Sequence, residues 1–237
     1  MSQIFRFKQF NVDQTGCAMK INTDGVLLGT IADAESPYSI LDIGTGTGVI
    51  ALMLAQRFAN ARVDAVEIDN VAAKTATANF ANSVFNDRLT VFPTDIQTFF
   101  DEHTDNKYDL IVSNPPFFIN SLESPKAKKT LAKHTNADFF EELMKDITGH
   151  LSTNGTCWLV LPIQTAGLIK ALAIENGMYL QKKISIRSFE HSEQHREIVC
   201  FSFEEVSTEI SILTIYKAAN IYTEEYKKLL QPYFIAF

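Results

Sequence analysis

The segment SILDIGTGTGVIALMLAQRF, residues 39–58, restricts the fold of this chain more than any other. It begins with a short apolar run at 39–43, continues through the glycines Gly44, Gly46 and Gly48, and ends with apolar residues at four-residue spacing. This order predicts a buried strand, a tight turn and a helix with one apolar face. A short apolar strand that leads through a turn into a helix is typical of a parallel sheet covered by helices.

The rest of the chain repeats this alternation. Further strands are expected at 61–68, 89–92, 108–113 and 156–162, and helices at 70–85 (capped by Asn70), around 139–147 and at 165–177. The strand-like runs 179–189 and 196–205 leave no room for a helix between them, so we predict an antiparallel hairpin. A last strand at 210–217 and a short helix at 223–230 follow. We therefore predict an α/β fold with a doubly wound, mostly parallel sheet and an antiparallel C-terminal hairpin.

Residues 1–35 precede the first strand of this pattern and form an N-terminal extension. Within it, NTDGVLLGTIAD is interpreted as a capped helix that begins at Thr23 or Asp24. Residues 36–237 follow without a repeat or a linker. The length suits one sizeable core, so we expect a single compact domain overall.

The charge of the chain limits how it can bind nucleic acid. A formal net charge of −7 excludes a polycation, so such binding requires a local basic patch. The segment ESPKAKKTLAKH offers one, although lysines in such a run also form ordinary solvated surface. Its lysines are Lys126, Lys128, Lys129 and Lys133.

The cysteines and histidines do not predict a metal site. Cys17, Cys157 and Cys200 are widely separated and form no CxxC pair, which favours reduced, buried thiols in a cytoplasmic protein. His191 and His195 have no apparent third ligand, so their segment is interpreted as a polar hairpin tip. The apolar runs and the N-terminus predict neither a membrane span nor a signal peptide.

The glycine turn predicts a nucleotide site, because glycines let a ligand approach the backbone and the following helix presents unpaired N–H groups. Its spacing departs from the dinucleotide fingerprint, which would place glycine or alanine at Val49. Asp42 stands just before the turn, where it would repel a pyrophosphate and suit a positively charged ligand. Glu67 lies at the end of the next strand and Asp95 follows the one after it, where carboxylates can accept from ribose hydroxyls and an adenine amino group.

With Asn114, Pro115, Pro116 and Phe117, these residues resemble the class I S-adenosylmethionine-dependent methyltransferases that carry an (N/D/S)PP(Y/F/W) motif. The resemblance implies a seven-stranded sheet whose seventh strand is antiparallel. It also implies that the glycine turn contacts the methionine part of the cofactor, with the ribose on Glu67 and the adenine on Asp95. The residues that the resemblance assigns to S-adenosylmethionine are Asp42, Gly44, Thr45, Gly46, Gly48, Glu67, Ile68, Asp95, Ile96 and Thr23.

The same resemblance gives the NPPF segment a chemical role. An exocyclic amine on a base is a poor nucleophile, because its lone pair is delocalised into the ring. The side-chain oxygen of Asn114 and the carbonyl of Pro115 would accept from its N–H groups, and the two prolines would hold these acceptors rigidly. Phe117 would stack on the flat target. Adenine N6, guanine N2 and a glutamine amide all remain open as targets.

The two ends of the chain narrow this choice. FKQFNVDQTGCAMKINTDGVLLG and YTEEYKKLLQPYFIAF resemble the start and the end of bacterial tRNA (adenine-N6)-methyltransferases, which modify the adenine beside the anticodon of a valine tRNA. This resemblance implies a tRNA partner, with Lys133 and His134 near the RNA. We expect such an enzyme, as a monomer or weak dimer with no membrane partner. Methyl transfer to guanine N2 or to a glutamine amide stays an alternative, whereas Asp42 and Val49 disfavour a nicotinamide-dependent oxidoreductase.

Overall fold

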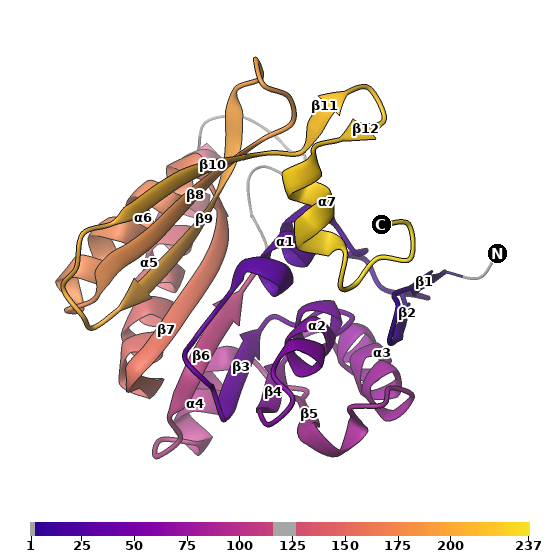
Figure 1. The fold of residues 1–237 in the computed structure, drawn as a ribbon. Helices are drawn as coiled ribbons and strands as arrows, with labels where there is room; N and C mark the ends of the chain where they lie inside the picture. Colours follow the sequence, from indigo (N-terminus) through magenta and orange to yellow (C-terminus); the bar gives the residue numbers. More distant parts are fainter. Residues whose placement is uncertain (1–2, 116–126) are drawn as a thin grey trace.

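The computed structural model describes residues 3–115 and 127–237, and of residues 127–136 the backbone alone. One eight-stranded sheet forms its centre (Figure 1). The strands are β3 (Ser39–Ile43), β4 (Arg62–Val66), β5 (Leu89–Phe92), β6 (Tyr108–Ser113), β7 (Leu151–Pro162), β8 (Tyr179–Arg187), β9 (Gln194–Ser202) and β10 (Glu209–Thr214). Their order across the sheet is β10-β8-β9-β7-β6-β3-β4-β5.

Of these eight strands, β9 alone runs against the others, because it pairs antiparallel with both β7 and β8. The predicted hairpin of β8 and β9 is thereby confirmed, with a register from Tyr179↔Ser202 to Arg187↔Gln194. The last predicted strand, β10, pairs in parallel with β8 and extends the edge of the sheet. The described sheet therefore has eight strands, where the family resemblance implies seven.

Helices cover both faces of the sheet (Figure 1). They are α1 (Thr23–Ile31), α2 (Val49–Arg57), α3 (Asn70–Ala81), α4 (Ile96–Glu102), α5 (Ala127–His150), α6 (Ile163–Glu175) and α7 (Glu224–Leu230), with a 3-10 turn at Asn86–Arg88. Apolar side chains of α1, α2, α3 and α7 form a core with one face, and those of α4, α5 and α6 form a core with the other. Successive residues of β3 enter opposite cores, Ile40 the first and Leu41 the second. This arrangement confirms the doubly wound α/β fold.

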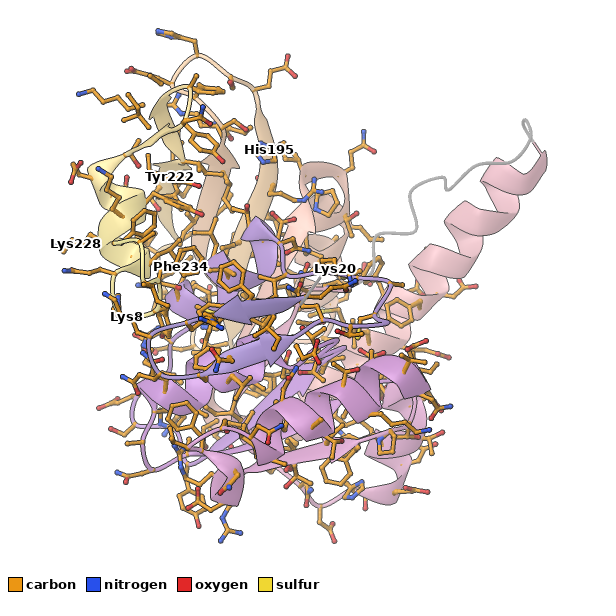
Figure 2. All side chains as sticks on the ribbon, turned by 90° about the vertical axis from the view of Figure 1, so that its right-hand side faces the viewer. Lys8, Lys20, His195, Tyr222, Lys228 and Phe234 are labelled. Atoms are coloured by element: carbon orange, nitrogen blue, oxygen red, sulfur yellow. The ribbon has the colours of Figure 1, made fainter. Side chains whose placement is uncertain are left out.

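The N-terminal extension packs against the C-terminal segment. The extension contains the hairpin of β1 (Ile4–Arg6) and β2 (Asn11–Asp13). The C-terminal segment contains a second small hairpin, formed by β11 (Tyr216–Ala218) and β12 (Ile221–Tyr222), which is followed by α7. Phe7 forms a β-bridge with Phe234, and Lys8 Nζ donates to the carbonyl oxygens of Gln231 (2.6 Å) and Phe237 (2.8 Å). Figure 2 labels Lys8 and Phe234 in this region. Phe7 also lies in the core that contains α1 and α2. The extension thus shares the core of the main domain.

Two helix starts are defined by side-chain caps. Helix α1 begins at Thr23, as predicted, and the Oδ1 atom of Asn22 accepts from Gly25 N at 2.8 Å. Helix α3 begins at Asn70, but its cap is Asp69, whose Oδ1 accepts from the backbone N–H groups of the next turn at 3.0 and 2.8 Å. The prediction of Asn70 as the cap is wrong, because the carboxylate one residue earlier reaches both N–H groups.

All three cysteines are free and buried, as predicted. In the part of the chain that the structure describes, no group of three His, Cys, Asp or Glu side chains is placed to hold a metal ion. Over the same residues, no helix combines the length and the apolar character needed to cross a membrane.

Candidate active site

Four neighbouring strands bring the predicted site residues to one edge of the sheet. Strands β6, β3, β4 and β5 are adjacent and parallel, so their carboxyl ends lie at the same edge. The glycine turn follows β3, Glu67 follows β4, Asp95 comes shortly after β5, and Asn114 directly follows β6. Open parallel sheets bind their ligands at this edge. These residues therefore form one candidate site.

The glycine turn leaves open space above two of its residues. Gly44 and Gly46 have φ angles of +72° and +58°, and a Cβ atom built on either would meet no atom within 4 Å in the described structure. Gly48 is different, since a Cβ there would lie 2.4 Å from Cε1 of Phe80. Gly48 therefore allows the turn to pack against α3, whereas the first two glycines leave room for a ligand to approach the backbone.

Asp42 places a carboxylate beneath this turn. It is fully buried, and its Oδ2 atom accepts from Thr45 Oγ1 (2.6 Å) and Ala51 N (3.2 Å). Its Oδ1 atom has no hydrogen-bond partner within the described residues. Burial raises the pKa of the Asp42 carboxyl group to about 7, although these two hydrogen bonds act in the opposite direction. A buried carboxylate of this kind favours a positively charged ligand nearby.

Glu67 is hydrogen-bonded to the glycine turn. Its Oε2 atom accepts from Gly46 N and its Oε1 atom from Asp69 N, both at 2.8 Å. A carboxylate has about four acceptor positions, so two remain for hydroxyl groups of a ligand. The next residue, Ile68, is 71% exposed, so its apolar side chain lies at the surface. Together they offer acceptors beside an apolar surface, which suits a ribose joined to a flat base.

Asp95 is the N-cap of α4. Its Oδ1 atom accepts from Thr98 N at 2.9 Å and its Oδ2 atom from Thr98 Oγ1 at 2.7 Å, and these bonds lower the pKa of the carboxyl group. The adjacent Ile96 is buried in the second core. The structure therefore gives Asp95 a structural role that the sequence analysis did not consider, and lone pairs remain on both oxygens for a ligand.

Asn114 lies where the first turn of α1 meets the end of β6. A Cβ atom built on Gly25 would be 3.5 Å from Asn114 Nδ2, so the half-buried amide packs close to this helix. Pro115 beside it is buried. Ser113 Oγ donates to the carbonyl oxygen of Ile43 at 2.8 Å and joins the ends of β6 and β3. Thr23, predicted to flank the cofactor, is the first residue of the same helix.

Several predicted residues fall outside this description. Pro116, Phe117 and Lys126 lie outside the described residues. Lys128, Lys129, Lys133 and His134 belong to the first turns of α5, of which the backbone alone is described. Their roles in base stacking and RNA binding therefore stay predictions.

Some residues that shape the site were not predicted from the sequence. Asn22 caps α1, Asp69 caps α3, and Phe80 packs against Gly48. The two caps could have been found from a weak signal, since each is an Asn or Asp directly before a predicted helix. The packing of Phe80 has no such signal, because it depends on how α3 lies against the turn.

The residues of this edge fit S-adenosylmethionine. The backbone is open at Gly44 and Gly46, a buried carboxylate lies beneath the turn for a cationic ligand, and Glu67 retains acceptors for hydroxyl groups. A doubly wound sheet with one antiparallel strand and this turn after its first strand is the arrangement of a class I methyltransferase, and a methyltransferase family model matches residues 20–167. This class implies S-adenosylmethionine as the methyl donor.

Comparison with known proteins gives the family. The methyltransferase small domain matches residues 20–167. Over 237 residues the chain is 49% identical to the tRNA1(Val) (adenine(37)-N6)-methyltransferase of Pedobacter heparinus, with 100% of both chains covered. A protein of the same name from Flavobacterium johnsoniae is 42% identical, with 98% of this chain and 99% of that one covered. The chain belongs to the methyltransferase small domain family and, within it, to the family of these two relatives.

The fold is shared with more distant solved structures. The crystal structure of a "predicted O-methyltransferase" from Agrobacterium tumefaciens superposes with a TM-score of 0.68 at 17% sequence identity. The match covers 89% of this chain and 96% of that one. At this identity the likeness supports the fold and leaves the substrate to other evidence.

Proposed function

We propose that the protein transfers a methyl group from S-adenosylmethionine to the exocyclic N6 amine of an adenine in tRNA, at the position beside the anticodon of valine tRNA. The observation that carries this proposal is the position of Asn114 and Pro115 at the end of β6, next to β3 and against the first turn of α1. Relatives named for adenine 37 of tRNA1(Val) support the choice of substrate.

The turn from Gly44 to Gly48 would hold the methionine part of the donor, with Asp42 beneath it. Glu67 would bind the ribose, and Ile68 and Asp95 would contact the adenine, while Thr23 on α1 borders the pocket. When bound, S-adenosylmethionine supplies an electrophilic methyl group. The chain must then present a flat amine in line with that group, an arrangement that can lower a barrier by roughly 7–11 kcal/mol in well-oriented systems.

Asn114 and Pro115 would prepare the amine for this reaction. The Oδ1 atom of Asn114 and the carbonyl oxygen of Pro115 would accept from the two N–H groups, which localises the lone pair on nitrogen. Because Pro115 is buried and restricted in φ, its carbonyl is held in place before the substrate arrives. No strong base is needed, since the amine loses its proton to water after the new N–C bond has formed. Phe117 would stack on the adenine.

The start of α5 would contact the RNA. Four lysines and a histidine occur between residues 126 and 134, in a chain with a net charge of −7. A local basic segment is what such an acidic protein needs in order to bind phosphates. A base in a single-stranded loop is also easier to extrude than one in a duplex, which favours an anticodon loop. A tRNA substrate agrees with a cytoplasmic protein that acts as a monomer or weak dimer.

The proposal is tested by methyl transfer from labelled S-adenosylmethionine to unmodified tRNA, followed by nucleoside analysis. We expect N6-methyladenosine in valine tRNA, and we expect Asn114→Ala to lower kcat by about 10²–10³-fold, as for other single groups that stabilise a transition state. Donor affinity in calorimetry should stay close to that of the unmodified protein. Asn60→Ala, at an exposed position before β4, serves as the matched control.

Three outcomes separate this proposal from its alternatives. Label in N2-methylguanosine or in protein glutamine would identify one of the alternative targets. Full activity in Asn114→Ala would show that the assigned acceptor is wrong. Binding of NADH, and not of S-adenosylmethionine, in calorimetry would indicate an oxidoreductase. The similarity to methyltransferases disfavours this alternative.

A further inference from the structure

Asn79 on α3 joins the glycine turn to the N-terminal extension. The side chain is 4% exposed, and its Oδ1 atom accepts from Asp13 N at 2.9 Å. Its Nδ2 atom donates to the carbonyl oxygens of Asp13 (3.0 Å) and Thr47 (2.9 Å). Both N–H bonds of the amide are thus used, one on each segment. A buried amide with this set of partners fixes the two backbone segments relative to each other.

The contact with Thr47 lies inside the turn that would hold the donor. Thr47 stands between Gly46 and Gly48, and its own side chain is buried. The residue after Asn79 is Phe80, whose ring fills the space beside Gly48. Two consecutive residues of α3 therefore support the turn, one through a hydrogen bond and one through packing. A glycine-rich turn needs such support, since glycine restricts the backbone less than other residues do.

Through Asp13, Asn79 is also connected to the chain segment that leads to α1, the helix that packs close to Asn114. Asp13 ends β2, and the loop that follows is tied together by bonds such as that from Ile21 N to Gln14 Oε1 (2.7 Å). The loop ends at the cap of α1, whose Gly25 packs close to the Asn114 amide. The segment from residue 13 to residue 25 therefore connects the glycine turn at one end with Asn114 at the other.

We propose that Asn79 is a positioning residue for the methyl donor, which holds the Thr47 carbonyl and so sets the shape of the Gly44–Gly48 turn. This inference rests on the proposed function, because it assumes that the donor binds at this turn. Asn79 acts through the backbone of the turn and of the extension, and it makes donor binding depend on the N-terminal hairpin.

The test uses the full-length protein and two variants. Asn79→Asp keeps the shape and the acceptor for Asp13 N, but an ionised carboxylate cannot donate to the carbonyl oxygens of Asp13 and Thr47. Asn79→Ser is smaller and retains one donor. We expect the dissociation constant of S-adenosylhomocysteine in calorimetry to rise about tenfold for Asn79→Asp, the factor that corresponds to about one hydrogen bond. The KM for S-adenosylmethionine should rise equally, with kcat at saturating donor changed less than about twofold.

A second measurement needs neither donor nor RNA. Hydrogen exchange of the backbone amides of residues 44–49 should become faster in both Asn79 variants, because the turn has lost the hydrogen bond from the Asn79 amide to the Thr47 carbonyl. Leu172→Ala on α6, in the opposite core, is the control: it lowers stability through a cavity without touching the turn. Its donor affinity and the exchange of residues 44–49 should match the unmodified protein.

Two results would overturn the inference. One is unchanged donor affinity in both Asn79 variants, and the other is equal loss of affinity in Leu172→Ala at equal loss of stability. If Asn79→Asp does not fold, Asn79→Ser and the exchange measurement decide the question. If the unmodified protein binds the donor but methylates no tRNA, the proposed substrate fails while the role of Asn79 is still tested.

Discussion

Replacing Asp42 with asparagine is expected to stabilise the ligand-free protein and to change its pH dependence. Asp42 is fully buried, and burial raises the pKa of its carboxyl group from 3.8 to about 7. Because the folded state binds this proton more tightly than the unfolded state, stability falls as the pH rises from 3.8 through about 7. The difference between these two pKa values means that, above pH 7, the ionised Asp42 lowers the free energy of unfolding by about 4 kcal/mol.

Asparagine removes the charge and keeps the shape of the side chain. Its oxygen can accept from Thr45 and Ala51, and its NH2 group takes the place of Oδ1, which has no donor among the described residues. Leaving that NH2 group without an acceptor costs about 1–3 kcal/mol. We therefore expect a net gain of about 1–3 kcal/mol at pH 8, or about 2–12 °C in Tm for a chain of this length. The gain should shrink by about 1.4 kcal/mol per pH unit below pH 7 and disappear near pH 5.

Urea unfolding of both proteins between pH 5 and pH 8 measures this difference. Asp105→Asn, at an exposed position before β6, should show stability curves parallel to those of the unmodified protein. If the curves of Asp42→Asn are parallel as well, the carboxyl group does not titrate as argued. S-adenosylmethionine should bind Asp42→Asn more weakly, because the buried negative charge that attracts its cationic groups is gone. Stability gained at the expense of binding is the usual result when a functional charge is neutralised.

Three further predictions test other parts of the site. Gly48→Ala should lower the free energy of unfolding, measured in urea, by about 2–4 kcal/mol. The reason is that a Cβ at this position would lie 2.4 Å from the Phe80 ring and that φ is +85°. As a control, Gly149→Ala in α5 should leave the free energy of unfolding unchanged or raise it. Asp95→Ala should lower the free energy of unfolding by about 1 kcal/mol because α4 loses its cap, whereas Asp95→Ser should keep the cap and the stability. If both variants bind S-adenosylhomocysteine equally more weakly, the contribution of Asp95 to adenine binding is separate from its role as a cap. The third prediction exchanges three lysines of α5 for glutamine, namely Lys128, Lys129 and Lys133. In filter binding, the slope of log affinity for tRNA against log salt should become less steep by about 0.7–0.9 per lost phosphate contact. An unchanged slope would contradict the role of these lysines in RNA binding.

The parts of the fold that follow from local pattern are predictable from the sequence. The strands at 39–43, 89–92 and 108–113 match the structure to the residue, because each is a short apolar run bounded by polar or turn residues. The glycine turn is equally predictable, since only glycine adopts its positive φ angles without strain. The parallel order of the strands then brings Glu67, Asp95 and Asn114 to the same edge.

Pairings between distant segments are not encoded in such patterns. The bond between Asp13 and Asn79 joins positions 66 residues apart, and it exists because α3 packs beside the N-terminal hairpin. The position of β10 beside β8, at the edge of the sheet, likewise depends on tertiary pairing. Asp95 shows a related difficulty, because one carboxylate can cap a helix and face a ligand at once, and a sequence motif does not separate the two roles.

The distribution of hydrogen bonds over the acids indicates which ligand the site receives. Glu67 and Asp95 each have both oxygens bonded to neighbouring protein groups, so the protein itself holds these side chains in place. Asp42 is bonded through Oδ2 only, although it is the most deeply buried of the three. Above pH 7 the protein would be more stable with asparagine at this position, so stability does not explain the presence of a carboxylate there. Its charge beneath the open turn is explained if the turn binds a positively charged ligand, as the sulfonium and ammonium of S-adenosylmethionine require.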